Sequence, residues 1–106
     1  MALRDNKESI ELIAKKYTEL VKNQININEA YLFGSYVKGT YLEDSDIDIA
    51  IIGNEFSGDF IEDTLKLMKL RRQIDNRIEP HPFNNKDFDI SNPFVQEILK
   101  DGIKIM

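Results

Sequence analysis

The sequence predicts an α/β (α+β) domain in which a small mixed β-sheet is covered by helices. Three observations lead to this prediction. Short apolar runs around Tyr31 and around Ile49 have the composition of buried strands. Several segments have apolar residues at the three- and four-residue spacing of amphipathic helices. A strand–helix–strand succession in the second half favours a parallel pair of strands, because such connections are nearly always right-handed crossovers.

Length and composition indicate one small domain over residues 1–106, located in the cytoplasm. Its 42% hydrophobic and 31% charged residues are ordinary for a globular protein. The chain has no cysteine, which excludes disulfides and thiolate metal sites. It has no signal peptide, and no apolar run approaches the ~20 residues of a membrane span. The net charge of −5 argues against broad nucleic-acid binding but permits a nucleotide site, since bound Mg²⁺ would reverse the local field.

The first half of the chain predicts a helix followed by two strands. Apolar residues at helical spacing predict a covering helix over residues 5–22. The run at residues 30–33 predicts a buried strand, and residues 46–52 predict a second one. We expect the two strands to be antiparallel neighbours. The end of the first and the beginning of the second would then lie at the same edge of the sheet.

The next segment predicts a helix and a strand. Asp59, with Glu62 three residues later, is a helix N-terminal signature. Apolar residues from Ile61 and Leu65 onward extend this helix over residues 59–75. Residues 77–83 form a short extended run whose prolines place it at a sheet edge or a strand end. We expect this strand to be parallel to the one at residues 46–52.

The last segment predicts a helix and a short final strand. Asn92 and Pro93 suit the N-cap and the first helical residue, and Gly102 suits the end of the helix. Residues 103–105 predict the strand. The expected buried stripe of the helix consists of Phe94, Val95, Ile98 and Leu99.

The pair Gly34-Ser35 ends the first strand and is a candidate phosphate-binding turn. Glycine allows a sharp turn and a close approach of the backbone to a ligand. If a helix begins at Ser35, its free N–H groups and positive dipole end face whatever lies over the turn, and phosphate is the natural ligand. Lys38 is a further candidate for contacting phosphate, with an ordinary solvated lysine as the alternative.

A pair of carboxylates opens the second strand. Asp46 and Asp48 share one face of it, because side chains alternate between the two faces of a strand. Like charges this close repel each other, and a divalent cation relieves the repulsion. Mg²⁺ suits carboxylates together with substrate phosphates. Glu79 opens its own strand in the same way, so it is a candidate third carboxylate of the site.

Gly34-Ser35, a gap of ten residues and Asp46-x-Asp48 together form a pattern that resembles the minimal nucleotidyltransferases of the DNA polymerase β superfamily. The resemblance covers most of the chain and implies the nucleotidyltransferase fold. Such proteins are commonly antitoxins (MNT-type) paired with a helical HEPN-type ribonuclease toxin. The resemblance implies that the chain transfers AMP from ATP to a tyrosine of such a toxin and thereby silences it, within an oligomer or hetero-oligomer.

The resemblance also implies roles for individual residues. Gly34 and Ser35 would hold the terminal phosphates of ATP, and Asp46 and Asp48 would bind Mg²⁺ that bridges those phosphates. Glu79 would bind a second ion or act as the base on the acceptor hydroxyl. The family more often has aspartate at this third position, so Glu79 departs from its pattern.

Two other functions fit the same residues. One is a non-catalytic antitoxin of the same fold that neutralises its partner by contact; the intact Ser35 and aspartates favour the enzyme over it. The other is nucleotidyl transfer to a small cationic molecule such as an aminoglycoside, which an acidic site would suit. His81 has the strand parity of Glu79 and is a candidate proton shuttle, but we expect it to be an ordinary surface residue between two prolines.

Overall fold

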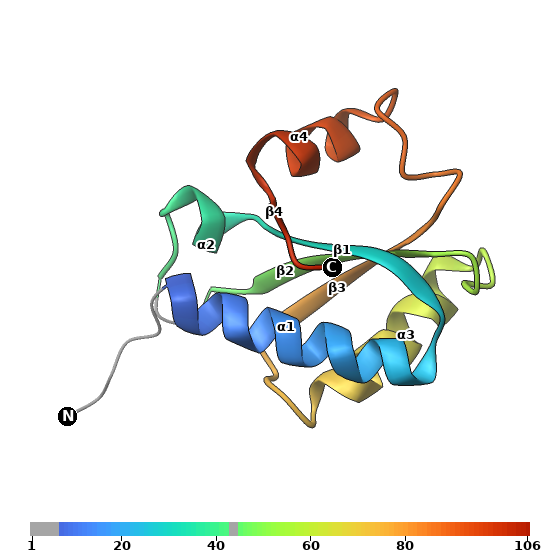
Figure 1. Ribbon diagram of the computed structural model, residues 1–106, viewed down its shortest axis with the longest axis horizontal. Coiled ribbons are helices and arrows are strands. Elements are labelled where there is room, and N and C mark those ends of the chain that lie inside the picture. Colours follow the sequence, from blue (N-terminus) through green and yellow to red (C-terminus); the bar gives the residue numbers. More distant parts are fainter. Residues whose placement is uncertain (1–6, 43–44) are drawn as a thin grey trace.

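The computed structural model describes residues 7–42 and 45–106 and has a four-stranded sheet with helices on both faces (Figure 1). Residues 5 and 6 of the expected first helix, and residues 43 and 44 between the two sequence motifs, lie outside this description. Within the described residues, no helix is long and apolar enough to cross a membrane. The elements are α1 (Lys7–Gln24), β1 (Ile27–Phe33), α2 (Ser35–Lys38), β2 (Ile47–Gly53), α3 (Phe60–Arg71), β3 (Ile78–Asn84), α4 (Pro93–Asp101) and β4 (Ile103–Lys104).

The sheet is mixed and has the strand order β3-β2-β1-β4. Strand β1 is antiparallel to both β2 and β4, whereas β3 is parallel to β2. The predicted pairing of the first two strands and the predicted parallel pair are therefore confirmed. The proline-containing strand β3 lies at the edge of the sheet, where its missing N–H groups cost no ladder hydrogen bonds.

The two faces of the sheet have different partners. Helices α1 and α3 pack on one face, and α4 packs on the other (Figure 1). Side chains alternate between the two faces along β2, so successive residues face different helices. Ile47, Ile49 and Ile51 face α1 and α3 and are fully buried, whereas Ala50 and Ile52 pack beside Ile98 of α4. Asp48 has the same parity as Ala50 and therefore lies on the α4 face.

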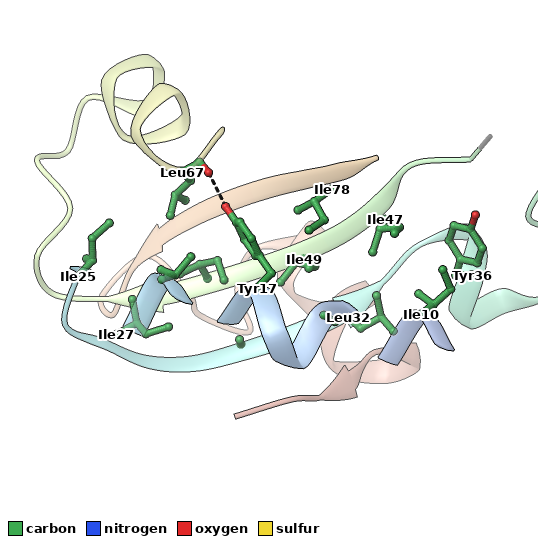
Figure 2. Packing of buried hydrophobic residues seen from close by; sticks show 14 of the residues in the cluster. Ile10, Tyr17, Ile25, Ile27, Leu32, Tyr36, Ile47, Ile49, Leu67 and Ile78 are labelled. Atoms are coloured by element: carbon green, nitrogen blue, oxygen red, sulfur yellow. Dashed lines mark hydrogen bonds between the residues drawn. The ribbon is translucent and has the colours of Figure 1, made fainter. Parts of the chain in front are cut away.

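Helices α1 and α3 are joined by a hydrogen bond inside the core that they form with the sheet. The hydroxyl of Tyr17 on α1 donates to the backbone carbonyl of Leu67 on α3 at 2.6 Å (Figure 2). Both side chains are fully buried. Burial raises the pKa of the Tyr17 hydroxyl, so it stays protonated and remains a donor.

The helix ends follow the predicted capping residues. The Asp59 side chain accepts hydrogen bonds from the backbone N–H groups of Ile61 and Glu62, and Asn92 accepts one from Phe94. The prediction for the extent of the third helix was wrong, because α3 ends at Arg71 and turns lead from there to β3.

One expectation about burial was also wrong, and it concerns α4. On α3, Leu67 is fully buried against the sheet, whereas Ile61 and Leu65 are 70% and 56% exposed. On α4 only Val95 and Ile98 are buried, while Phe94 and Leu99 are 39% and 43% exposed at the margins of the expected stripe. A short amphipathic helix buries a narrow stripe, so its flanking apolar residues remain accessible.

We predict that Tyr17→Phe lowers the free energy of unfolding by about 1 kcal/mol, the net value of one buried hydrogen bond. Urea unfolding measures the change. Tyr31→Phe is the matched control, since its half-buried hydroxyl bonds only to the side chain of Glu29 two residues away. Equal losses of unfolding free energy in both variants would show that the α1–α3 hydrogen bond contributes no more to stability than the Tyr31–Glu29 bond does.

Candidate active site

The sheet brings the two sequence motifs together at one edge. Phe33, the last residue of β1, pairs with Asp48 near the start of β2, and Asp48 pairs in turn with Glu79 near the start of β3. Gly34 follows Phe33 directly, so the Gly-Ser turn lies beside Asp48. The predicted meeting of the turn with the carboxylates is confirmed for Asp48. Gly34 after β1, Asp48 of β2 and Glu79 of β3 thus lie side by side at this edge.

Gly34 approaches the Asp48 carboxylate more closely than any other residue type could. Its φ and ψ angles are 86° and −153°, a combination essentially restricted to glycine. A Cβ atom on Gly34 would lie 2.3 Å from Oδ2 of Asp48, well inside van der Waals contact. The Gly34 carbonyl then accepts hydrogen bonds from the N–H groups of Val37 and Lys38, which begin the single turn of α2. A short helix thus begins at Ser35, which meets the condition set for a phosphate-binding turn.

The other oxygen of Asp48 has a histidine partner. Nε2 of His81 on β3 lies 3.1 Å from Oδ1 of Asp48. The two side chains are 24% and 23% exposed, so the pair is partly shielded but still reaches solvent. Asp46, just before β2, is more exposed. The two aspartates therefore differ, since one is held between a glycine and a histidine and the other faces water.

The expectation that His81 is an ordinary surface residue was wrong. Its ring packs against Phe33 at a centroid distance of 5.0 Å and against Phe94 at 5.8 Å, and its nitrogen meets Asp48. Strand parity alone placed it on the correct face, but only the pairing of β2 with β3 brings it to the carboxylate. The aromatic contacts come from β1 and α4, which the sequence does not connect to His81.

The donor set fits a hard cation in part. Two carboxylates at the start of β2, Asp48 within it and Asp46 just before it, suit Mg²⁺, which prefers oxygen ligands and often takes several from substrate phosphates. Within residues 7–42 and 45–106, however, no group of three or more His, Asp or Glu side chains is placed to hold a metal ion. Glu79 shares the register of Asp48 without completing such a group. Any Mg²⁺ held by Asp46 and Asp48 would take its remaining oxygen ligands from water or from substrate phosphates.

Lys38 lies near the turn but is engaged with α4. Its Nζ atom forms an ion pair with Oε1 of Glu97 at 2.7 Å, and both side chains are about half exposed. The hydrogen bond and charge of Lys38 lower the pKa of the Glu97 carboxyl. Lys38, Gly34 and Glu97 line one small cavity of about 120 Å³. The lysine is thus close enough to the turn to remain a candidate phosphate contact.

An arginine connects α2 to the start of β3 on the other side of the site. Arg77 donates to the Tyr36 hydroxyl at 3.2 Å and forms an ion pair with Asp75 at 2.8 Å. The hydrogen bond from Arg77 holds the pKa of the Asp75 carboxyl below its usual range. The Arg77 carbonyl also accepts from the N–H of Ile47, the first residue of β2. These contacts hold the beginnings of β2 and β3 beside the turn.

Sequence comparison identifies the family to which this arrangement belongs. Residues 15–106 match the family described as Polymerase beta, Nucleotidyltransferase, which is most of the chain. The chain belongs to the polymerase β nucleotidyltransferase family. It is therefore an enzyme of the nucleotidyltransferase class, as the resemblance of its motifs predicted.

Two curated relatives of this nucleotidyltransferase come from Methanocaldococcus jannaschii. One, named "Putative protein adenylyltransferase MJ0604", is 35% identical over 98 residues, which are 91% of this chain and 89% of the relative. Another, "Putative protein adenylyltransferase MJ1379", is 27% identical over 94 residues, with 89% and 91% covered. The similarity extends over nearly the whole of each protein.

Solved structures share the fold. A nucleotidyltransferase from Sulfolobus solfataricus has a TM-score of 0.62 at 22% identity, covering 98% of this chain and 89% of that one. A chain of a toxin–antitoxin complex with AMP-PNP has a TM-score of 0.57 at 23% identity, covering 88% and 72%. A mutant of the toxin–antitoxin MntA-HpeT gives 0.62 at 22% identity, covering 88% and 71%. The mixed sheet with its helices is thus the nucleotidyltransferase fold.

We predict that Gly34→Ala disrupts the site of this nucleotidyltransferase. The alanine methyl would collide with the Asp48 carboxylate, and the backbone would be strained. We expect a loss of about 2 kcal/mol or more in unfolding free energy, measured by urea denaturation, together with loss of nucleotidyl transfer.

Gly39→Ala is the matched control for this prediction. Gly39 also has a positive φ, 78°, but a Cβ there would meet nothing within 4 Å. It should lose only about 1 kcal/mol through backbone strain and keep its activity. Similar behaviour of both variants would contradict the argument from the Asp48 contact.

Proposed function

We propose that the chain is a Mg²⁺-dependent adenylyltransferase that transfers AMP from ATP to a hydroxyl group of a partner protein. The observation that carries the proposal is the juxtaposition of Gly34 with the Asp48 carboxylate at one sheet edge. A turn that offers backbone N–H groups to phosphates and a carboxylate pair that suits Mg²⁺ are the two requirements for binding a nucleoside triphosphate in this family. The names of the curated relatives support the adenylyl group and the protein acceptor.

In this proposal each residue has a defined task. Gly34 and Ser35 hold the terminal phosphates, with Lys38 as a further contact, and Asp46 and Asp48 hold Mg²⁺. The proposed mechanism uses two Mg²⁺ ions. When bound, they would supply positive charge to the phosphates. His81 meets Oδ1 of Asp48, and the backbone of Gly34 leaves room for Oδ2 beside it, so the two residues together position the carboxylate. Most of the catalysis would come from positioning and charge.

The reaction replaces a phosphoanhydride bond of ATP with a phosphoester bond to the acceptor. The acceptor oxygen bonds to the α-phosphorus of ATP while the bond from that phosphorus to the oxygen leading to the β-phosphate breaks, and pyrophosphate leaves. The hydroxyl proton passes to Glu79, whose position next to Asp48 across β3 and β2 suits a base. This assignment makes Glu79 a proton acceptor beside the reacting centre.

The partner in this proposal is a toxin. Two of the similar folds belong to toxin–antitoxin complexes, one of them with AMP-PNP. Together with the motif resemblance, this supports an antitoxin that modifies a tyrosine of a HEPN-type ribonuclease in the cytoplasm. Modification of that tyrosine would silence the ribonuclease.

A second candidate is a non-catalytic antitoxin that neutralises its partner by contact. One observation favours it: the described residues include no group of three ligands arranged for a metal ion. In this alternative Asp46 and Asp48 would serve an interface rather than an ion. The two functions differ in whether ATP is consumed.

Labelled ATP tests the proposed reaction. We predict that the purified chain with Mg²⁺ transfers label from α-labelled ATP, but not from γ-labelled ATP, to a protein in host lysate. Asp48→Asn should lower the rate of label transfer at least about 100-fold, because the variant removes one charge while keeping the shape of the side chain. Circular dichroism checks that the variant is folded. Glu19→Gln, an exposed change on α1, is the matched control and should leave the transfer unchanged.

Three other outcomes would change the assignment. Transfer of the γ label alone would indicate kinase chemistry and contradict adenylylation. Undiminished transfer by Asp48→Asn would contradict the metal assignment. If no label moves while a stable complex forms with a partner, the non-catalytic antitoxin is the correct function.

A further inference from the structure

A pocket lined by phenylalanine side chains lies beside the Asp48–His81 pair. It has a volume of about 310 Å³ and is walled by β3, by the first turn of α3 with the segment before it, and by α4. His81 belongs both to this pocket and to the contact with Asp48. Its aromatic lining comes from Phe56, Phe60, Phe83 and Phe94, and we call it the phenylalanine pocket.

The lining excludes a phosphate group as the occupant. Among the lining residues that the structure describes, there is no lysine or arginine, whereas Asp63 and Asp87 contribute carboxylates. The Asp63 carboxylate is already occupied, since it accepts hydrogen bonds from Ser57 and Gly58. Asp87 and Asn84 remain near the rim. A neutral or cationic ring with a hydrogen-bond donor suits this combination of aromatic walls and acceptor groups.

The chemistry of the proposed reaction places the pocket on the acceptor's side. In an in-line displacement the incoming oxygen and the departing pyrophosphate lie on opposite sides of the α-phosphorus. The terminal phosphates are assigned to the turn after β1, and the carboxylates to β2. Because the strand order is β3-β2-β1, this assignment puts the incoming oxygen on the β3 side of the carboxylates. The phenylalanine pocket lies along β3, from His81 to Asn84.

The pocket is open to a partner. Phe60 is 62% exposed and Phe94 is 39% exposed, although both rings are large and apolar. Exposed aromatic rings around a hollow are typical of surfaces that bind another molecule. Pockets of this kind take a single aromatic side chain as an anchor, and such anchors dominate the energy of an interface.

We propose that the phenylalanine pocket binds an aromatic side chain of the protein acceptor, which reaches the active site across β3. The proposal rests on the proposed function for the direction of attack, and it assigns a docking surface that the proposed function leaves open. An adenine base, the other planar group present in the reaction, is the alternative occupant. The size and lining of the pocket would admit both rings, so the experiment must separate them.

Binding of two small probes to the isotopically labelled chain separates the occupants without any transfer reaction. N-acetyl-tyrosinamide represents the acceptor side chain, and adenosine represents the base without its phosphates. In nuclear magnetic resonance titrations without Mg²⁺, we expect N-acetyl-tyrosinamide to shift the backbone amide signals of Phe60, Phe83 and Asn84. Adenosine should leave those signals unchanged.

A pair of neighbouring variants tests the site. Phe60→Ala removes an exposed ring from the pocket wall and should weaken N-acetyl-tyrosinamide binding by about five-fold or more. Ile61→Ala is the matched control, because Ile61 follows Phe60 on α3, is 70% exposed and does not line the pocket. It should bind the probe as the unmodified chain does.

The outcomes separate this inference from the proposed function. Shifts at the pocket with adenosine instead of N-acetyl-tyrosinamide, shifts with neither probe, or equal weakening in both variants would each overturn the inference. None of these results depends on label transfer from ATP. Conversely, N-acetyl-tyrosinamide binding in a chain that transfers no label would support the docking site and contradict only the enzymatic proposal.

Discussion

The close approach of the Gly34 backbone to the Asp48 carboxylate is the constraint on which the active edge depends. Strands β1 and β2 are antiparallel, and Phe33 at the end of β1 pairs with Asp48. Gly34, the residue after β1, therefore lies against the Asp48 side chain. A one-residue change of register would turn the whole alternation of β2 over, which would send Asp48 into the core under α1 and α3 and move Ile47 and Ile49 out of it. The fully buried Ile47 and Ile49 therefore fix the position of the carboxylate between them.

The main hydrophobic core and the candidate site lie on opposite faces of the sheet. The face under α1 and α3 holds the larger core and the Tyr17–Leu67 hydrogen bond. The opposite face has a smaller cluster around Ile98 of α4, and Asp48 and Glu79 near the starts of β2 and β3 remain partly exposed. A thinner cover on that face allows Asp48 and His81 to be partly buried and yet reach solvent. It also leaves room for the phenylalanine pocket.

Much of the fold was predictable from residue patterns, because those patterns are local. Helical spacing, the caps at Asp59 and Asn92, and the proline-containing edge strand each depend on a few consecutive residues. The end of α3 and the exposure of Ile61 were not predictable in this way. Which apolar residues of a helix are buried depends on the angle at which the helix meets the sheet, and one sequence does not specify that angle.

The sequence by itself determined which residues are candidates for the chemistry, since the Gly34-Ser35 turn and the aspartate pair form a recognisable spacing. It also determined that Asp48 lies on the face of its strand opposite to Ile47 and Ile49, because alternation is a property of the extended backbone. Only the tertiary structure decided that His81 meets Asp48, that Lys38 pairs with Glu97, and that phenylalanine rings from three separate segments form one pocket. These contacts join residues far apart in the chain, and strand pairing and helix packing, rather than any local pattern, bring them together.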